Sequence, residues 1–329
     1  MLKKVLASLT IVGLAANMAF ATRAHADDTV TLRLNWYLGG WMAPFYYGLE
    51  QGFYKEEGID LTISEGRGSG VAVQIVGAKS DTFGFADVST LILAVAKDVP
   101  VKSVASILNV NDAGIISLEG SNIRTAADLK GKRIAVTAGD SATATFPAVL
   151  KVNGLTRDDI IVIQVDAAAK PVMVMEGQAD ALLGGLSDQP FLMQEKGFKT
   201  EAVTFAELGV SLVGFAVIAN DDTIAENPDL VRRFVKATSR AWEAARANPE
   251  SVMSALHTVN PDFNLERGLK QLNVMLALMD TPNTAGNPAG FHSEKDWSDL
   301  IALLKEYREL ETDLPTTAFF TNDFIPTKQ

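Results

Sequence analysis

Residues 29–63 read TVTLRLNWYLGGWMAPFYYGLEQGFYKEEGIDLTI, and this stretch determines the fold class. Apolar and polar residues alternate at its start and β-branched residues are frequent there, which predicts a strand. A loop with two glycines follows, and Pro44 then stands where the first turn of a helix accepts proline. Glycines end that helix, and residues 59–63 form a second strand. The order strand, loop, helix, strand is the repeating unit of an α/β protein.

The same unit recurs along the chain. Further strands are predicted over 82–86, 101–108, 115–118, 131–136, 160–165, 181–184 and 215–219. The spacing of apolar residues predicts a helical C-terminal third, with helices over 228–245, 249–257, 265–279 and 294–310. We therefore expect an α/β fold with largely parallel strands, and the length of the chain favours two domains.

The first 26 residues have the layout of a secretory signal peptide. Two lysines precede an apolar run over 5–20, and the small-x-small sequence Ala24-His25-Ala26 predicts cleavage after Ala26. A second cleavage site at Ala21 and an uncleaved anchor are the alternatives. With cleavage, we expect a soluble protein of the periplasm.

Composition limits the partners and the chemistry. The 329 residues contain no cysteine, which excludes disulfides, thiolate metal sites and cysteine nucleophiles. The net charge is −11, and removal of residues 1–26 would take away three basic and no acidic residues, leaving −14. A field of this sign repels nucleic acid and anionic membranes. No His-Glu-x-x-His, Gly-x-Ser-x-Gly or phosphate-loop motif is present. We therefore expect neither a metal ion nor a cofactor.

Several short stretches, in this order and spacing, resemble the NMT1/THI5-like family. They are Ala43-Pro-Phe-Tyr46 after Trp36, Gly52-Phe-Tyr-Lys-Glu-Glu-Gly-Ile-Asp-Leu61, Gly68-Ser-Gly70, Phe83-Gly-Phe-Ala-Asp87, Asp128-Leu-Lys-Gly-Lys132 and Met175-Glu-Gly-Gln-Ala-Asp180. The family comprises substrate-binding proteins of ABC importers for thiamine-precursor pyrimidines, with relatives that bind sulfonates, taurine, riboflavin or aromatic acids. Met42 stands where pyrimidine binders often carry histidine.

The resemblance implies a two-lobed periplasmic-binding-protein fold of the second type, whose lobes close on a ligand about two hinge crossings. Residues 27–118 and 214–329 would form lobe 1 and residues 119–213 lobe 2, with crossings near 115–118 and 214–219. It also implies a monomer that delivers its small-molecule ligand to a membrane permease.

Two classes of function are compared. As a binding protein, the chain would capture a small flat heteroaromatic solute such as a thiamine-precursor pyrimidine, or alternatively a sulfonate, taurine or an aromatic carboxylate. As an enzyme, it would resemble the yeast pyrimidine synthases of the same superfamily, which consume a histidine and use a cysteine-rich iron-binding segment. The absence of cysteine and the export signal favour binding without catalysis, and no nucleophile–base set is visible.

Ligands of open α/β lobes lie where strands end and helices begin, so the loops at those points supply the candidate residues. In the loop over residues 35–41, aromatic rings offer stacking faces to a ligand, or else pack within the lobe. In the Gly66–Gly70 loop, Arg67 offers a bidentate fork to an anion and its neighbours offer backbone N–H groups, or else the loop is a plain turn. The polar residues that follow the strand over 82–86 either touch the ligand or only cap the next helix. The lobe 1 candidates are Trp36, Tyr37, Trp41, Arg67, Ser69, Gly70, Asp87, Ser89 and Thr90.

Lobe 2 supplies two similar loops. Gly139–Thr143 precedes a predicted helix, and Asp188 precedes Pro190, so each acidic residue either contacts ligand or caps its helix. Asp188 would accept a hydrogen bond from an amino group on a heterocycle. The lobe 2 candidates are Asp140, Ser141, Thr143 and Asp188.

Overall fold

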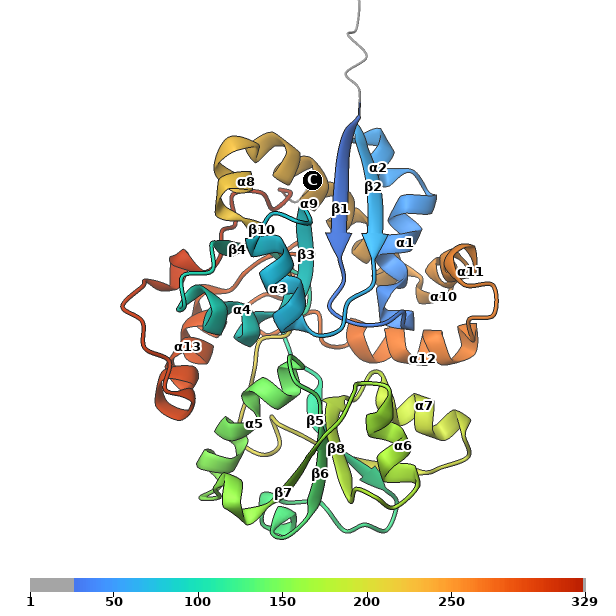
Figure 1. Ribbon diagram of the computed structural model, residues 1–329. Helices are drawn as coiled ribbons and strands as arrows, with labels where there is room; N and C mark the ends of the chain where they lie inside the picture. Colours follow the sequence, from blue (N-terminus) through green and yellow to red (C-terminus); the bar gives the residue numbers. More distant parts are fainter. Residues whose placement is uncertain (1–26, 328–329) are drawn as a thin grey trace, which may run out of the picture.

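Ten strands form two separate five-stranded sheets within residues 27–327, which the computed structural model describes (Figure 1). The expected signal peptide lies outside these residues. The first sheet has the order β2-β1-β3-β10-β4, and its strands are β1 Asp28–Arg33, β2 Ile59–Ser64, β3 Phe83–Asp87, β4 Val101–Ser106 and β10 Phe215–Asn220. The second has the order β7-β6-β8-β5-β9, and its strands are β5 Ala113–Leu118, β6 Arg133–Val136, β7 Ile161–Gln164, β8 Ala181–Gly185 and β9 Thr200–Thr204.

The two sheets have the same plan. In the first, β10 runs antiparallel to both β3 and β4, while β1, β2 and β3 are parallel. In the second, β5 runs antiparallel to both β8 and β9, while β6, β7 and β8 are parallel. The expected α/β class and two-lobed architecture are confirmed, but each sheet is mixed rather than wholly parallel.

The reversed strand of each sheet is the one that the chain enters from the other lobe. The strand predicted over 115–118 belongs to the second sheet, because β5 pairs with β8 and β9. The expected boundary at residue 118 placed this strand in lobe 1, whereas its pairing places it in lobe 2. The connecting segments are residues 107–112 and 205–214. The crossings expected at 115–118 and 214–219 are largely strand, so the turns between lobes lie just before each of them.

Most helices follow the predicted pattern. Those of the first lobe are α1 Ala43–Glu50, α2 Phe53–Glu56, α3 Ser69–Gly77, α4 Val88–Val95, α8 Asp221–Glu226, α9 Pro228–Ala247, α10 Pro249–Met253, α11 Ala255–Val259, α12 Leu265–Leu276 and α13 Glu294–Arg308. Those of the second are α5 Ser141–Val152, α6 Ala169–Met175 and α7 Gln189–Glu195. The single helix expected over 249–257 is divided at Ser254, and β9 was not predicted.

Successive side chains of the first sheet enter two different cores, because neighbouring residues of a strand point to opposite faces. Phe83, Phe85 and Val217 pack in the core that contains residues of α1 and α9. Ala86 and Ile218 pack in the core that contains residues of α3 and α4. The sheet is thus covered by helices on both faces.

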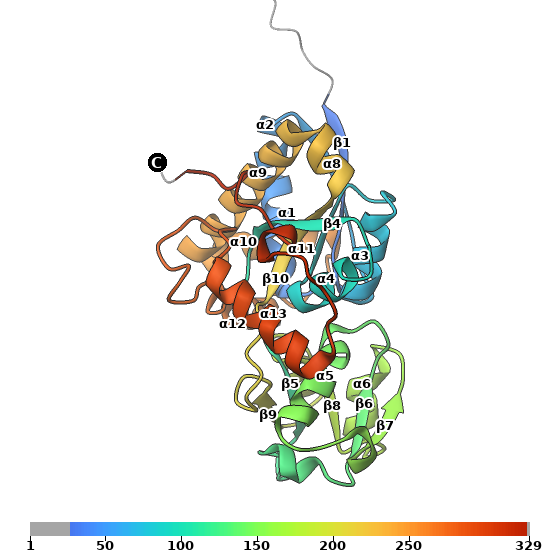
Figure 2. The same cartoon turned by 90° about the vertical axis from the view of Figure 1, so that its left-hand side faces the viewer.

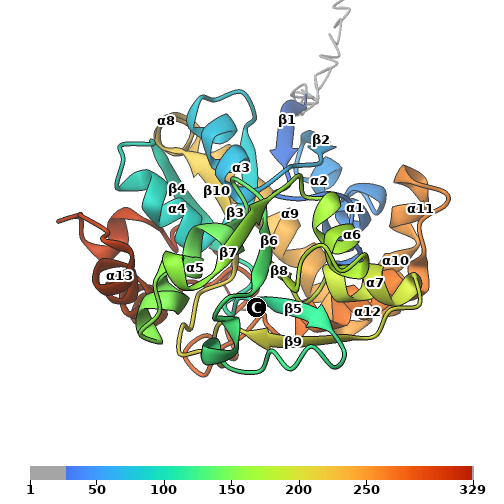
Figure 3. The ribbon, with the colours of Figure 1, turned by 60° about the horizontal axis from the view of Figure 1, so that its bottom comes forward.

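Helix α13 joins the two lobes. It follows the last strand of lobe 1 in the chain, yet it packs beside α5 of lobe 2, as two views show (Figures 2 and 3). Trp297, Leu300 and Leu304 of α13 share one apolar core with Phe146 and Val149 of α5. This side of the molecule therefore holds the lobes together through buried apolar surface.

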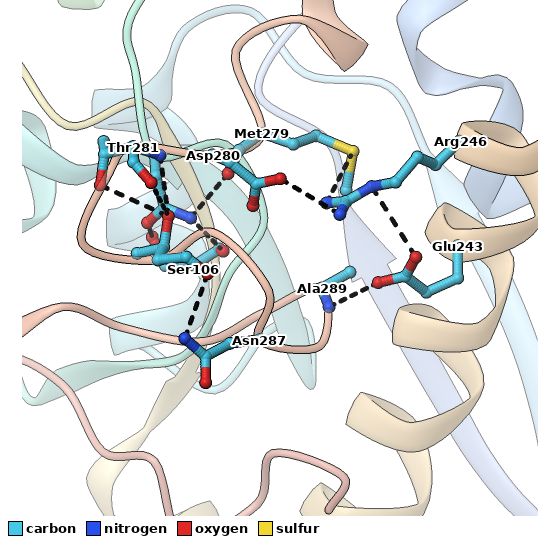
Figure 4. A network of polar contacts seen from close by, with 10 residues as sticks. Ser106, Glu243, Arg246, Met279, Asp280, Thr281, Asn287 and Ala289 are labelled. Carbon is cyan, nitrogen blue, oxygen red and sulfur yellow. Dashed lines mark hydrogen bonds and ion pairs between the residues drawn. The ribbon is translucent and has the colours of Figure 1, made fainter. Parts of the chain in front are cut away.

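Polar contacts fix the first connecting segment to lobe 1. Asn109 accepts a hydrogen bond from Ser106 Oγ at 2.9 Å and donates to the Met279 carbonyl at 2.8 Å. Figure 4 shows Arg246 of α9 reaching Asp280 and the sulfur of Met279. The connection therefore leaves lobe 1 from a fixed point.

Among residues 27–327, no helix combines the length and apolar character that crossing a bilayer requires.

Candidate functional site

A small cavity lies between the lobes, where loops from both sheets meet. Its volume is about 40 Å³, which is room for two or three water molecules and far below the roughly 300–1,000 Å³ of sites that enclose small molecules. A ring-sized ligand therefore enters only if the lobes separate. The cavity is lined by Asn35, Trp36, Trp41, Asn111, Asp112, Ala113, Asp140, Ser141, Ala142, Gly185, Ser187, Asp188, Gln189, Phe215 and Met275.

The two lobes approach each other closely beside this cavity. The Gly70 N–H of lobe 1 donates to the Gly139 carbonyl of lobe 2 at 3.3 Å. Gly68 has a φ of +125°, and a Cβ there would lie 2.5 Å from the same carbonyl oxygen. Only glycine fits at this position without pushing the lobes apart.

Asp188 links the lobes from the second side of the cavity. It accepts hydrogen bonds from Trp36 Nε1 at 3.0 Å and from Gln271 Nε2 at 3.2 Å, and both donors belong to lobe 1. Burial raises the pKa of Asp188 to about 6, and the hydrogen bond from Trp36 opposes that rise. The carboxylate thus links the two lobes and also lines the cavity.

A buried ion pair lies beneath Trp36. Lys170 is fully buried, and its Nζ contacts the Asp140 carboxylate and donates to the Leu183 carbonyl at 2.7 Å. The same Nζ lies 5.4 Å from the centre of the Trp36 ring. Lys170 is therefore committed to protein partners, and it supports the aromatic wall of the cavity from below.

Two further carboxylates are buried near the cavity. Asp112 accepts hydrogen bonds from the N–H and hydroxyl of Ser187, and burial raises its pKa. Asp87 accepts from the N–H and hydroxyl of Thr90 and from Asn111 Nδ2 at 2.7 Å, and burial raises its pKa to about 7. The carboxylates outnumber the single lysine, so the potential of the cavity favours positive or hydrogen-bond-donating groups.

Three residues that line the cavity each have a buried polar atom without a hydrogen-bond partner. These atoms are Asn35 Oδ1 and Trp41 Nε1 of lobe 1 and Gln189 Oε1 of lobe 2. Nearly all buried polar atoms in folded proteins are hydrogen-bonded, so this concentration requires an explanation. The residues that line the cavity therefore retain one donor and two acceptors without protein partners.

The N-termini of two helices at the cleft are already matched with carboxylates. Asp140 caps α5 by accepting from the Ala142 N–H at 2.9 Å, and Asp87 caps α4 by accepting from the Thr90 N–H at 2.7 Å. A negative ligand would have to compete with these side chains for the same backbone groups. The geometry is therefore unfavourable for a sulfonate or a carboxylate.

The structure brings some of the predicted residues to the cavity and leaves others apart. Those that line it are Trp36, Trp41, Asp140, Ser141 and Asp188. Tyr37 lines a neighbouring pocket instead. Arg67 is exposed, and its guanidinium lies 5.8 Å from the centre of the Tyr37 ring.

The remaining predicted residues serve the loops behind the cavity. The Ser69 hydroxyl accepts from the Asp87 N–H at 3.0 Å, and Thr90 completes the cap of α4 with Asp87. The hydroxyl of Ser89 is buried without a partner. Thr143 Oγ1 accepts from the Thr137 N–H at 3.4 Å.

Several lining residues were not predicted. Asn35 and Gln189 each stand next to a predicted residue, and their position in the same loops was the available signal. Asn111 and Asp112 lie in the first connecting segment and carry no local motif.

Within residues 27–327, His, Asp and Glu side chains form no group of three or more arranged to hold a metal ion.

Comparisons with known proteins agree with this architecture. The model of the family described as NMT1/THI5 like matches residues 41–252. A 4-amino-5-hydroxymethyl-2-methylpyrimidine phosphate synthase of Candida albicans is 28% identical, with 75% of this chain and 76% of the relative covered. A formylaminopyrimidine-binding protein of Halalkalibacterium halodurans is 22% identical, with 88% and 89% covered. The alkanesulfonate-binding protein SsuA of Xanthomonas axonopodis pv. citri, bound to MOPS, has a TM-score of 0.70 at 18% identity, with 90% and 99% covered, and shares the fold.

Proposed function

The chain belongs to the NMT1/THI5-like family, and we propose that it is a solute-binding protein that captures an amino-bearing heteroaromatic compound, such as a pyrimidine, between its lobes. We propose further that residues 1–26 direct it to the periplasm, where it delivers this ligand to the membrane permease of an ABC importer. A two-lobed fold with loops meeting at a shared cavity supports capture by closure about the two connecting segments.

One observation carries the choice of ligand. Asn35, Trp41 and Gln189 line the same cavity from both lobes, and each has a buried polar atom without a hydrogen-bond partner. An aminopyrimidine has ring nitrogens that accept and an amino group that donates, so it matches both kinds of atom. The carboxylate of Asp188 suits the amino group, and Trp36 and Trp41 suit the flat ring.

Charge argues against the anionic alternatives. Lys170 is fully buried and paired with Asp140, and Arg67 lies outside the cavity. A sulfonate or an aromatic carboxylate would meet buried carboxylates without a free cation to balance it. The name of the Halalkalibacterium halodurans relative, a formylaminopyrimidine-binding protein, agrees with an amino-bearing pyrimidine.

Isothermal titration calorimetry with three probes tests the proposal. We expect 4-amino-5-hydroxymethyl-2-methylpyrimidine to bind at least tenfold more tightly than ethanesulfonate or benzoate, and to raise the melting temperature by mass action. Absence of binding by all three probes would refute capture of such solutes. Tighter binding of ethanesulfonate would overturn the ligand class alone.

Two variants on one helix sharpen this test. Gln189→Met removes a buried amide that lines the cavity, and Gln194→Met changes an exposed amide on the same helix. A lost hydrogen bond of about 1.4 kcal/mol weakens pyrimidine binding about tenfold in Gln189→Met. Gln194→Met should bind within twofold of the unchanged protein. Because Gln189 Oε1 has no partner, the first variant should also unfold at no lower temperature without ligand.

A pyrimidine-forming enzyme is the second candidate, because the Candida albicans relative is named as a synthase. The two functions differ in whether the pyrimidine is a ligand or a product. A binding protein leaves the amount of pyrimidine unchanged, whereas a synthase forms new pyrimidine. Mass spectrometry of the pyrimidine before and after incubation of the protein separates them, since an unchanged amount supports binding and net formation supports the synthase.

A further inference from the structure

A second pocket adjoins the cavity between the lobes. Its volume is about 250 Å³, and it is lined by Trp36, Tyr37, Leu38, Ala167, Ala168, Pro171, Asp188, Gln189, Leu192, Arg267 and Gln271. We call it the outer pocket, and the 40 Å³ cavity the inner cavity. Trp36, Asp188 and Gln189 border both, and Trp36 Nε1 donates to Asp188 at this shared border.

The outer pocket differs in chemistry from the inner cavity. Rings and small apolar groups from both lobes form most of its wall, and Trp36 and Tyr37 meet edge to face there with ring centres 5.6 Å apart. Its one cationic residue, Arg267, is paired with Glu195 across the lobes. Glu195 therefore balances the charge of the guanidinium, while the buried Nε of Arg267 has no partner and can still donate to an uncharged acceptor.

We propose that the outer pocket is a second subsite, which binds an uncharged flat or apolar substituent carried by the amino-bearing ring of the inner cavity. This inference rests on the proposed function. Together the two spaces approach the roughly 300 Å³ at which small-molecule sites begin. A ligand that extends from one to the other passes between Trp36 and Asp188 and replaces their mutual hydrogen bond with contacts of its own.

The outer pocket restricts the chemical class of ligand more narrowly than the inner cavity alone does. In this arrangement the amino group would point toward the carboxylates, and the ring carbon next to it would carry the substituent outward between Tyr37 and Leu192. Ala167 and Ala168 have small side chains at this wall, which leaves width for a ring-sized group. A bare aminopyrimidine would fill only the inner part of the site.

Calorimetry with two matched probes tests this subsite in the full chain. The head probe is 4-amino-5-hydroxymethyl-2-methylpyrimidine, and the extended probe is its benzyl ether. Burial of the benzyl group should make the extended probe bind about tenfold more tightly than the head probe. Equal affinities, or weaker binding of the extended probe, would overturn the second subsite while binding of the head probe left the proposed function intact.

Two substitutions in the wall of the outer pocket provide an independent test of the second subsite. Ala168→Phe places a ring at the pocket, and Leu192→Ser removes an apolar contact, while neither residue lines the inner cavity. Both should erase the advantage of the extended probe and leave the head probe within twofold. The matched control is Ala127→Phe, at an exposed position of lobe 2 that lines neither space, and it should preserve the advantage.

Other outcomes also separate the two proposals. If the outer-wall variants weaken both probes equally, the pocket is only a structural support of the inner cavity and the second subsite is wrong. If neither probe binds the unchanged protein, the proposed function fails, and the second subsite fails with it.

Discussion

Lys170 and Asp140 form the buried ion pair that supports the candidate site, and its removal has a calculable cost. Lys170 has no exposed surface, and Asp140 is 6% exposed. Asp140 Oδ2 contacts Lys170, while Asp140 Oδ1 caps α5. Lys170→Met keeps the length of the side chain but leaves the carboxylate without its cation. Breaking a buried ion pair by removing one partner destabilises a protein by about 3–5 kcal/mol.

The double variant distinguishes this cost from loss of packing. Lys170→Met with Asp140→Asn removes both charges, while the asparagine oxygen can still cap α5. The Leu183 carbonyl still loses its donor at 2.7 Å, which costs about 1 kcal/mol. The double variant should therefore be about 1–2 kcal/mol less stable than the unchanged protein, and more stable than either single variant.

Urea unfolding at pH 7 measures the four free energies of the cycle. The coupling energy between the two positions should exceed about 2 kcal/mol. A value below about 0.5 kcal/mol would show that the two charges stabilise the fold independently, and the account of Lys170 as a cation committed to Asp140 would be wrong. Lys170 would then count as a free cation beside the cavity.

Two further predictions concern pH and closure. Burial raises the pKa of Asp87 from 3.8 to about 7. The folded protein therefore keeps a proton on this carboxyl that the unfolded chain loses above pH 4. The stability that this group contributes is greatest below pH 4 and is lost as the pH rises through 7. At about 1.4 kcal/mol per pKa unit, the unfolding free energy of Asp87→Asn should rise by roughly 4 kcal/mol relative to that of the unchanged protein between pH 4 and pH 8. If urea unfolding shows that the two free energies change in parallel across that range, this account of Asp87 is wrong. Glu195 of α7 contacts Arg267 and accepts from Asn264 Nδ2 at 2.5 Å, both from lobe 1, so Glu195→Gln should speed pyrimidine dissociation two- to fivefold in stopped-flow fluorescence with little change in the unfolding free energy. An unchanged dissociation rate would show that this contact does not hold the lobes closed.

Local patterns were sufficient to place most elements but not to assign every strand to a sheet. The alternation of Thr29–Leu34 and the apolar run over 215–219 are properties of neighbouring residues, and both strands form where predicted. The assignment of β5 depends on pairing with β8 and β9, which lie more than 60 residues further along the chain. An apolar strand such as Ala113–Leu118 has the same pattern in either sheet.

The site was predictable to the level of its loops. Parallel strands end at a common edge of each sheet, and the family resemblance implied that the two lobes close on each other. The loops containing Trp36, Asp140 and Asp188 were therefore expected to meet, and these residues line one cavity. Which side chain of a loop faces the cavity depends on its conformation. Arg67 shows this, because its guanidinium lies over Tyr37 on the outside, whereas Gln189, which resembles an ordinary helical residue, faces inward.

The charge distribution of the cleft connects its stability to its ligand. Asp188 and Asp112 each have a raised pKa because burial disfavours their ionised forms, so the closed arrangement bears a cost that apolar residues would avoid. An amino-bearing guest lowers that cost by donating to the carboxylates, whereas an anion increases it. The same residues therefore make closure over the correct ligand more favourable than closure over a wrong one. Discrimination of this kind needs no rearrangement beyond the separation of the lobes about residues 107–112 and 205–214.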